Sequence, residues 1–184
     1  MSSGRPLADA ASAVRVRAAL PADAAALALL GRATFLESYA HLLPATDILA
    51  HVELHHTPQA YARWLADPAC HCWLAEAAPG GAPVGYLMAT PPDLPLPDIG
   101  PLDLEIRRIY LLHRFQGLGL GRWLMEEVRQ AARVAGLTRL LLGVYSRNVA
   151  ALAFYERSGF TQAGTREFRV GANTYHDYIL QRTP

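Results

Sequence analysis

The sequence contains no lysine, because all seventeen of its basic residues are arginine. This absence excludes enzymes that form a Schiff base on a lysine amine and P-loop proteins whose lysine binds phosphate. Cysteine is also scarce: Cys70 and Cys72 stand two residues apart in a strand-like stretch. Their side chains then share a face, but an extended backbone is too stiff to bridge them. We expect free thiols and a reducing compartment.

Long apolar runs are missing as well. No stretch reaches the length of a transmembrane helix, and Arg15 and Arg17 interrupt the one apolar run near the start that resembles a signal peptide. Seventeen basic and sixteen acidic residues leave a net charge of +1, so no strong field attracts the chain to nucleic acid or to an anionic membrane. We expect a cytoplasmic protein that binds neither, with residues 1–13 as a flexible tail.

The residues that are present fit one folded domain over residues 14–184. The chain has 184 residues, 52% of them hydrophobic and 18% charged, so a second full-sized domain has no room. Residues 91–103 hold five prolines and are interpreted as a loop that faces the substrate. Hydrophobic periodicity and turn residues predict strands at 14–18, 70–76, 84–89, 104–112, 137–145, 160–170 and 173–182, and helices at 21–34, 46–56, 58–67, 119–136 and 148–158.

A glycine-rich turn lies between a predicted strand and a predicted helix, with the sequence Gln116-Gly-Leu-Gly-Leu-Gly-Arg122. Glycines let the backbone approach a ligand closely, and the first amides of a helix have no partner within the helix. Such a turn therefore suits a pyrophosphate. The spacing is neither GxGxxG, because Arg122 replaces the third glycine, nor Walker A, because no lysine follows. By itself the turn is equally consistent with a tight structural connection.

A second block follows the next strand: Arg147-Asn148-Val-Ala-Ala-Leu-Ala-Phe-Tyr155-Glu-Arg-Ser-Gly-Phe160. In this order the two blocks resemble the GNAT superfamily of N-acetyltransferases, and the resemblance covers residues 74–180. It implies an α/β (α+β) domain with a mixed, mostly antiparallel, twisted sheet and helices on both faces. It also implies that acetyl-CoA, as co-substrate, binds where the strands at 104–112 and 137–145 splay apart.

The resemblance implies which residues bind acetyl-CoA, mostly through the main chain. The pantetheine arm pairs with the strand before the glycine turn, and an amide near Ile109 faces the thioester carbonyl as an oxyanion donor. Asn148 contacts the cofactor as well, although its residue type also suits a plain helix N-cap. The full set implied for the cofactor is Ile109, Tyr110, Leu111, Gln116, Gly117, Leu118, Gly119, Leu120, Gly121, Arg122 and Asn148.

Acetyl transfer to an amine requires a base, because an alkylammonium with a pKa near 10.4 is almost fully protonated at pH 7. Glu105 is the candidate, since it lies eleven residues before Gln116, the spacing at which several family members place a catalytic glutamate. The alternative is a structural carboxylate paired with Arg107 or Arg108. Some relatives instead carry an acid five residues before the motif asparagine, but that position is Gly143 in this sequence.

The departing CoA thiolate needs a proton or a hydrogen bond, which a phenol can supply. Tyr155 occupies the position of this general acid in the resemblance. The alternative is that Phe154 and Tyr155 are both core aromatics. Adjacent residues on a helix point in different directions, which favours one of them facing the cleft. We expect direct attack by the amine in a ternary complex, without a covalent acyl-enzyme.

The acceptor is less constrained by the sequence. Residues 34–39 and 104–110 resemble a bacterial subgroup that includes polyamine acetyltransferases, and Glu37 and Tyr39 are the predicted substrate-binding residues. Glu37, Asp47 and Glu53 offer carboxylates to a cationic small-molecule amine such as a polyamine. A peptide or protein N-terminal amine is an alternative acceptor, and a non-catalytic acyl-CoA sensor is an alternative function. Homodimers are common in the family, but the sequence specifies no interface.

No metal is expected. His51 and His55 stand at i and i+4, a spacing that metal ligands use, but no glutamate follows His51 in the HExxH pattern. We interpret these histidines as a solvated helix face. Cys70 and Cys72 lack the second cysteine pair that a four-ligand zinc site would need, and they are assigned to the strand core.

Overall fold

A computed structural model describes residues 13–170 and 173–184, so the predicted tail lies, except for Ala13, outside the described residues. Seven strands form one sheet in the order β1-β2-β3-β4-β5-β7-β6. All neighbouring strands are antiparallel except β4 and β5, as the sequence predicted. The strands are β1 (Val14–Ala18), β2 (His71–Ala77), β3 (Ala82–Thr90), β4 (Asp103–Leu111), β5 (Arg139–Tyr145), β6 (Thr161–Val170) and β7 (Asn173–Arg182).

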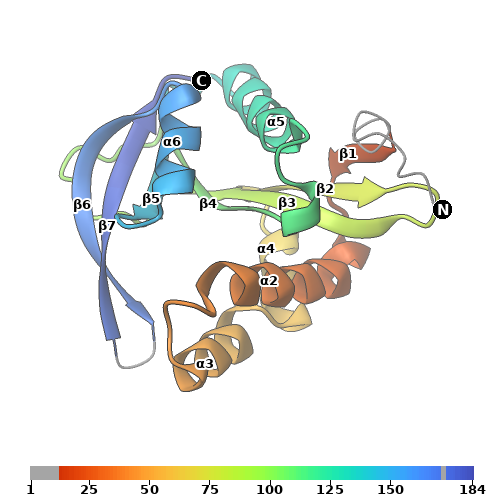
Figure 1. The fold of residues 1–184 in the computed structure, drawn as a ribbon. Coiled ribbons are helices and arrows are strands. Elements are labelled where there is room, and N and C mark those ends of the chain that lie inside the picture. The colour runs from red at the N-terminus through yellow and green to blue at the C-terminus, as the bar shows by residue number, and fades with distance from the viewer. Residues whose placement is uncertain (1–12, 171–172) are drawn as a thin grey trace.

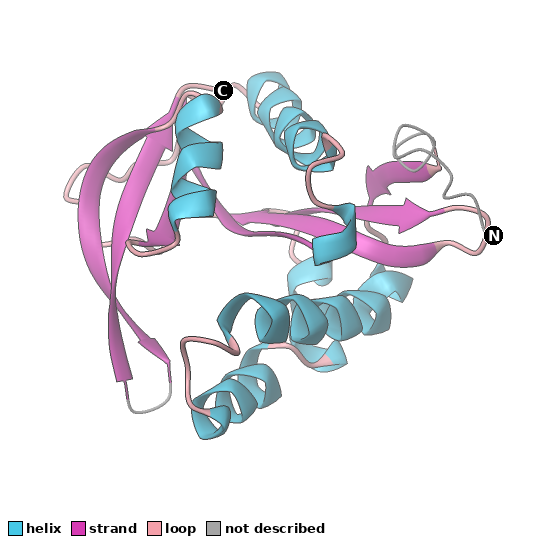
Figure 2. Cartoon of the chain, viewed as in Figure 1, coloured by secondary structure: helices cyan, strands magenta, loops and turns pink. Residues whose placement is uncertain are grey.

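Helices cover both faces of the sheet (Figures 1 and 2). On one face lie α2 (Ala24–Tyr39), α3 (Ala45–His55) and α4 (Pro58–Ala66), and on the other lie α5 (Leu120–Val134) and α6 (Val149–Arg157). Two 3-10 turns, η1 (Pro21–Asp23) and η2 (His113–Phe115), precede α2 and the glycine-rich turn. No helix in the described part of the chain is long and apolar enough to cross a membrane.

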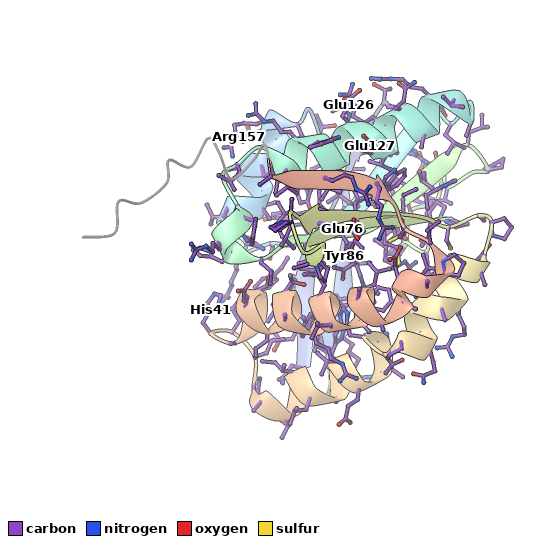
Figure 3. The ribbon with its side chains drawn as sticks, turned by 90° about the vertical axis from the view of Figure 1, so that its right-hand side faces the viewer. His41, Glu76, Tyr86, Glu126, Glu127 and Arg157 are labelled. Carbon is purple, nitrogen blue, oxygen red and sulfur yellow. The ribbon has the colours of Figure 1, made fainter. Side chains whose placement is uncertain are left out.

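The sheet is packed on each side by a separate apolar cluster. Toward α2 and α4, Tyr86 and Leu74 contact Leu27 and Tyr61, and Figure 3 labels Tyr86 between the sheet and α2. Toward α5, alternate residues of the same strands, such as Leu87, meet the buried face of the helix. The alternation of side chains along β2 and β3 thus divides the core into two layers.

Several predicted boundaries differ from the structure, and two of the differences have a clear physical cause. Helix α2 continues past Thr34 to Tyr39, because Phe35 is buried in a cluster with Leu43 and Ile48 and this packing outweighs the weak local pattern. Strand β5 begins at Arg139 rather than Leu137. The Leu137 amide instead donates to the Ala132 carbonyl and closes the end of α5.

Strand β4 is irregular in a way that places functional side chains. Its register against β3 shifts so that Met88 pairs with Arg108 and Ala89 with Ile106, which leaves Arg107 as the extra residue of a bulge. The bulge reverses the alternation of faces. As a result Glu105 and Arg108, three positions apart, both avoid the α5 layer that receives Ile106 and Ile109.

Strands β4 and β5 diverge soon after they meet. Their pairing ends at Glu105 opposite Leu141, whereas β4 stays paired with β3 as far as Leu111. Arg139 secures the paired part, since its guanidinium lies 2.7 Å from carboxylate oxygens of both Asp98 and Asp103. The splay that the resemblance implied is therefore present, and it opens the sheet in its middle.

Candidate active site

One large cavity of about 1080 Å³ occupies the splay and continues on both faces of the sheet. The end of the cavity at the glycine-rich turn, called the glycine-turn end, lies beside α5 and α6. The aromatic end of the cavity lies between the α2–α3 segment and the tip of β6 and β7, on the opposite face (Figure 1). The glycine-turn end is lined by Gln116, Gly117, Gly119, Gly121, Arg122, Asn148 and Arg157; the aromatic end by Phe35, Tyr39, His51, Phe168 and Tyr175.

The glycine-rich turn has the backbone of an anion cradle. Gly117 and Gly119 have φ values of 76° and 83°, in the left-handed region that side chains disfavour. Gly119 is the N-cap of α5 and has no side chain to satisfy the first helical amides. Leu118 and Leu120 point away from the cavity into the apolar core, so any contact they make with a ligand is through their main chain.

Replacing Gly119 with alanine is expected to weaken binding of a pyrophosphate ligand and to lower stability by about 1–2 kcal/mol, the cost of a left-handed residue with a Cβ. Thermal unfolding and equilibrium binding of acetyl-CoA measure the two effects. Gly80→Ala is the matched control, because Gly80 has open space around it and no positive φ. Unchanged affinity in Gly119→Ala would contradict the role assigned to this turn.

The free edge of β4 presents backbone amides to the cavity. The Leu112 amide donates to the Val84 carbonyl of β3 at 2.9 Å. Because successive residues of a strand face opposite edges, the amides of Ile109 and Leu111 point toward the splay and that of Tyr110 toward β3. Tyr110 instead contributes its side chain to the cavity wall. Gln116 reaches back to this edge, where its Nε2 donates to the Leu111 carbonyl at 3.1 Å.

Asn148 combines the two roles that the sequence left open. Its Oδ1 accepts a hydrogen bond from the Ala151 amide at 3.1 Å, so it is the N-cap of α6. It also lines the cavity. Capping fixes the orientation of the side chain and the position of α6 against the glycine turn.

Glu105 is 3% exposed and lines the cavity at the point where β4 and β5 part. Its Oε2 accepts hydrogen bonds from the Asp93 amide at 2.8 Å and from Arg107 Nη2 at 3.2 Å. The ion pair that the sequence offered as an alternative role is therefore present, with Arg107 as the partner. The Asp93 contact ties the proline-rich loop to the same carboxylate, which holds it in one place.

Tyr155 lies on α6 and faces the cavity while its ring packs into the core. Its ring centroid is 5.3 Å from that of Phe154 and 5.8 Å from that of Phe160. Burial, reinforced by the nearby Tyr110, raises the pKa of the Tyr155 phenol well above its ordinary value. The hydroxyl therefore stays protonated at neutral pH.

Of the two predicted substrate-binding residues, Tyr39 and Glu37, only Tyr39 lines the cavity. Tyr39 lines the aromatic end, where interaction with Tyr110 and then burial raise the pKa of its phenol. Glu37 does not line the cavity, because its Oε2 accepts a hydrogen bond from the His113 amide at the start of η2. Asp47 likewise lies elsewhere and bonds to Asn173. The carboxylates suggested for a cationic acceptor are thus engaged outside the cavity or exposed on α3, as Glu53 is.

The histidines line the cavity. The interpretation as a solvated helix face was wrong for His51 and His56, whereas His55 is exposed on α3. His51 stacks on Phe35 with centroids 4.1 Å apart, and His56 is 1% exposed with Nδ1 2.9 Å from the Tyr61 hydroxyl. Burial is the main cause that lowers the pKa of His51 to about 4 and that of His56 to about 2. Both rings are neutral at pH 7. Within residues 13–170 and 173–184 no histidine, cysteine and carboxylate cluster could hold a metal.

Two charged residues of the cavity escaped sequence reasoning. Asp177 on β7 is 5% exposed and pairs with Arg166 on β6, whose Nη2 lies 3.1 Å from its Oδ2. Burial raises the pKa of the Asp177 carboxyl, and Arg166 counteracts this rise. The guanidinium occupies the space above Gly143, where an added Cβ would lie 2.5 Å from Nη2. Only the register of β6 against β7 brings these residues together, so no local pattern predicted them.

Comparison with known proteins agrees with this geometry. The model of the acetyltransferase (GNAT) family matches residues 36–160. The chain belongs to the GNAT family of acetyltransferases. An uncharacterised N-acetyltransferase of Mycobacterium tuberculosis strain H37Rv is 32% identical over 160 residues, which is 87% of this chain and 97% of the relative. The N-alpha-acetyltransferase RimI of the same organism is 36% identical over 126 residues, 64% of this chain and 71% of the relative.

The fold of the GNAT family is also found by structural comparison. The PaiA N-acetyltransferase from Thermoplasma acidophilum, solved in complex with coenzyme A, superposes with a TM-score of 0.72 at 16% identity, covering 93% of this chain and 99% of the other. The chain is therefore an acyltransferase of the GNAT family, whose acyl donor is acetyl-CoA. The glycine turn and the β4 amides fit this donor, since the turn has the backbone of an anion site and the amides of Ile109 and Leu111 face the splay, where they could donate to carbonyls of the pantetheine arm.

Proposed function

We propose that this GNAT enzyme transfers an acetyl group from acetyl-CoA to the primary amine of a small molecule by direct attack in a ternary complex. The observation that carries the proposal is the continuity of one cavity. It joins the glycine-turn end, suited to the donor, to the aromatic end, which is left for the acceptor, with Glu105 and Tyr155 in its wall. A cytoplasmic location and a homodimer remain predictions from the sequence and the resemblance.

Glu105 is the proposed base of the reaction. An ammonium group must lose its proton before nitrogen can attack a carbonyl carbon. The carboxylate is fixed by Asp93 and Arg107 through Oε2, which leaves Oε1 for the amine or for a water molecule that relays the proton. Its place at the splay is beside the β4 edge whose amides face the donor.

Acetyl-CoA supplies an activated thioester, and the chain stabilises the charges that develop as the C–N bond forms and the C–S bond breaks. We assign the Ile109 amide to the negative charge on the thioester oxygen, because it points into the splay and has no partner in β5. Tyr155 then protonates the departing sulfur. Its raised pKa keeps the phenol protonated throughout the neutral range, so a proton is available for the sulfur.

A covalent route through cysteine has little support. Neither Cys70 nor Cys72 lines the cavity. Burial raises the pKa of the Cys70 thiol to about 11 and that of the Cys72 thiol to about 12. Both are therefore protonated at neutral pH and are weak nucleophiles, which favours direct attack by the amine.

Two classes of acceptor are candidates: a small-molecule amine and a peptide N-terminus. A small-molecule amine is the acceptor that the sequence favoured, with a polyamine as the example. The relative named N-alpha-acetyltransferase RimI favours a peptide N-terminus instead. A screen of CoA release with polyamines, amino acids and short peptides separates these classes, and transfer to none of them would support the alternative of an acyl-CoA sensor.

Binding of the donor is tested first by thermal unfolding. Acetyl-CoA at about 100 times its Kd is expected to add about 2.7 kcal/mol of stability, a rise in Tm of about 5–10 °C for a chain of this size. NAD and ATP are the controls, because the turn departs from both of their motifs. An unchanged Tm with acetyl-CoA, or an equal rise with all three, would remove the main support for the proposal.

A further inference from the structure

Arg108 on β4 is a half-buried arginine without a counter-ion among the described residues. It lines the cavity, and its Nη1 is inaccessible to solvent and has no hydrogen-bond partner among the described residues. None of the carboxylates in the described ranges forms an ion pair with it. A guanidinium nitrogen that is buried without a hydrogen-bond partner lowers the stability of the folded protein. Four other partly buried arginines of the sheet pair with carboxylates, namely Arg17, Arg107, Arg139 and Arg166. Arg182 on β7 donates instead to the main-chain carbonyls of Ser158 and Thr183.

The neighbours of Arg108 supply no negative charge. Its guanidinium carbon lies 5.6 Å from the centroid of the Tyr61 ring, and the Tyr61 hydroxyl is already bonded to His56 and Tyr86. His51 and His56 are neutral, as described above. The two buried carboxylates of the cavity are committed elsewhere, Glu105 to Arg107 and Asp177 to Arg166. This part of the cavity therefore carries an uncompensated positive charge.

The position of Arg108 limits how far its ligand lies from the reaction. It is the residue immediately before Ile109, whose amide we assign to the thioester oxygen, and consecutive strand residues are about 3.3 Å apart. An anion bound by the Arg108 side chain is therefore no farther from the reacting atoms than the length of one arginine side chain and one strand residue. The bound anion and the attacking nitrogen can belong to one small molecule.

We propose that the acceptor is a small amine that also bears a carboxylate a few bonds from the nitrogen, such as a free amino acid, and that Arg108 binds this carboxylate. The inference rests on the proposed acetyltransferase function and narrows its substrate class. A guanidinium offers paired N–H donors that match the two oxygens of a carboxylate. A polyamine would instead bring further positive charge to Arg108, and an ordinary peptide N-terminus lacks a nearby carboxylate.

The test compares each free amino acid with its own carboxamide, which keeps the amine and the side chain but loses the charge. We expect kcat/KM to be about 10- to 100-fold higher for the acid, the range expected for losing a charged hydrogen-bonded pair. Arg108→Gln should lower kcat/KM for the acid by a similar factor and leave that for the carboxamide nearly unchanged. Arg63→Gln is the control, since Arg63 is exposed on α4 and outside the cavity.

Several outcomes would overturn the proposal while leaving the acetyltransferase function intact. Equal rates for acids and carboxamides, faster transfer to polyamines, or an equal loss on both members of a pair in Arg108→Gln would each do so. Absence of transfer to any amine would instead refute the proposed function. Acetyl-CoA binding and Tm verify that each variant folds. If Arg108→Gln is unfolded, two measurements decide the question. The first is the preference of the unaltered enzyme for acids over carboxamides. The second is the KM of Arg108→Lys for acids, which should rise because lysine keeps the charge but loses the paired donors.

Discussion

Replacing Glu105 with glutamine is expected to lower kcat by about 10²- to 10⁴-fold, the usual contribution of a general base, while the Kd of acetyl-CoA stays unchanged. Glutamine keeps one oxygen that can accept the hydrogen bonds from Asp93 and Arg107, so the loop and the strand remain anchored. The variant loses only the ability to take a proton. Steady-state kinetics at saturating acetyl-CoA, together with equilibrium binding, measures the two quantities.

The pH profile separates a base from a structural carboxylate. As pH rises toward the pKa of the acceptor amine, near 10 for an alkylamine, the amine deprotonates without help. The ratio of kcat in the unaltered enzyme to kcat in Glu105→Gln should therefore fall. Glu127→Gln is a matched control, because Glu127 on α5 (labelled in Figure 3) lies outside the cavity and accepts a hydrogen bond from Trp123. A constant ratio at all pH values, accompanied by a lower Tm, would assign Glu105 a structural role instead.

Replacing Tyr155 with phenylalanine is expected to lower kcat by about 10²-fold, at the low end for loss of a general acid. The phenol makes no hydrogen bond with the described residues, so its removal leaves the packing against Phe154 and Phe160 intact. The Tm and the Kd of acetyl-CoA should therefore be unchanged. The effect should persist across the neutral pH range, because the raised pKa keeps the phenol protonated throughout.

Tyr178→Phe serves as the control for this variant. Tyr178 packs against the same apolar cluster but does not line the cavity. If both substitutions reduce kcat equally, the hydroxyl of Tyr155 has no special part in the reaction. If Tyr155→Phe changes the Kd of acetyl-CoA and leaves kcat unaltered, Tyr155 binds the donor and does not protonate the thiolate.

Most of the fold followed from local patterns. The glycine turn, the strand before it and the capped helix at Asn148 are specified by residues close in sequence, and the structure places them as predicted. The strands predicted at 70–76 and 84–89 and the helix predicted at 58–67 are also found, as β2, β3 and α4. These features depend on turn chemistry and periodicity, which a single sequence displays directly.

The aromatic end of the cavity was not predicted, because it is assembled from distant segments. Phe35 and His51 meet Phe168 only after α2 and α3 pack against the tip of β6 and β7. Arg166 and Asp177 are brought together by strand register. The bulge at Arg107, which directs Arg108 away from the α5 layer, leaves no mark in the hydrophobic pattern. Side chains that define an acceptor site thus depend on tertiary contacts.

The divergence of β4 and β5 has a consequence for how this enzyme can change in evolution. In the proposed arrangement the donor meets main-chain amides and glycine positions at the splay, and amino-acid replacements elsewhere leave a peptide group unaltered. The proposed acceptor end is lined by side chains from several separate elements, and each can be exchanged singly. Selection can therefore replace the acceptor in small steps while donor recognition is inherited intact.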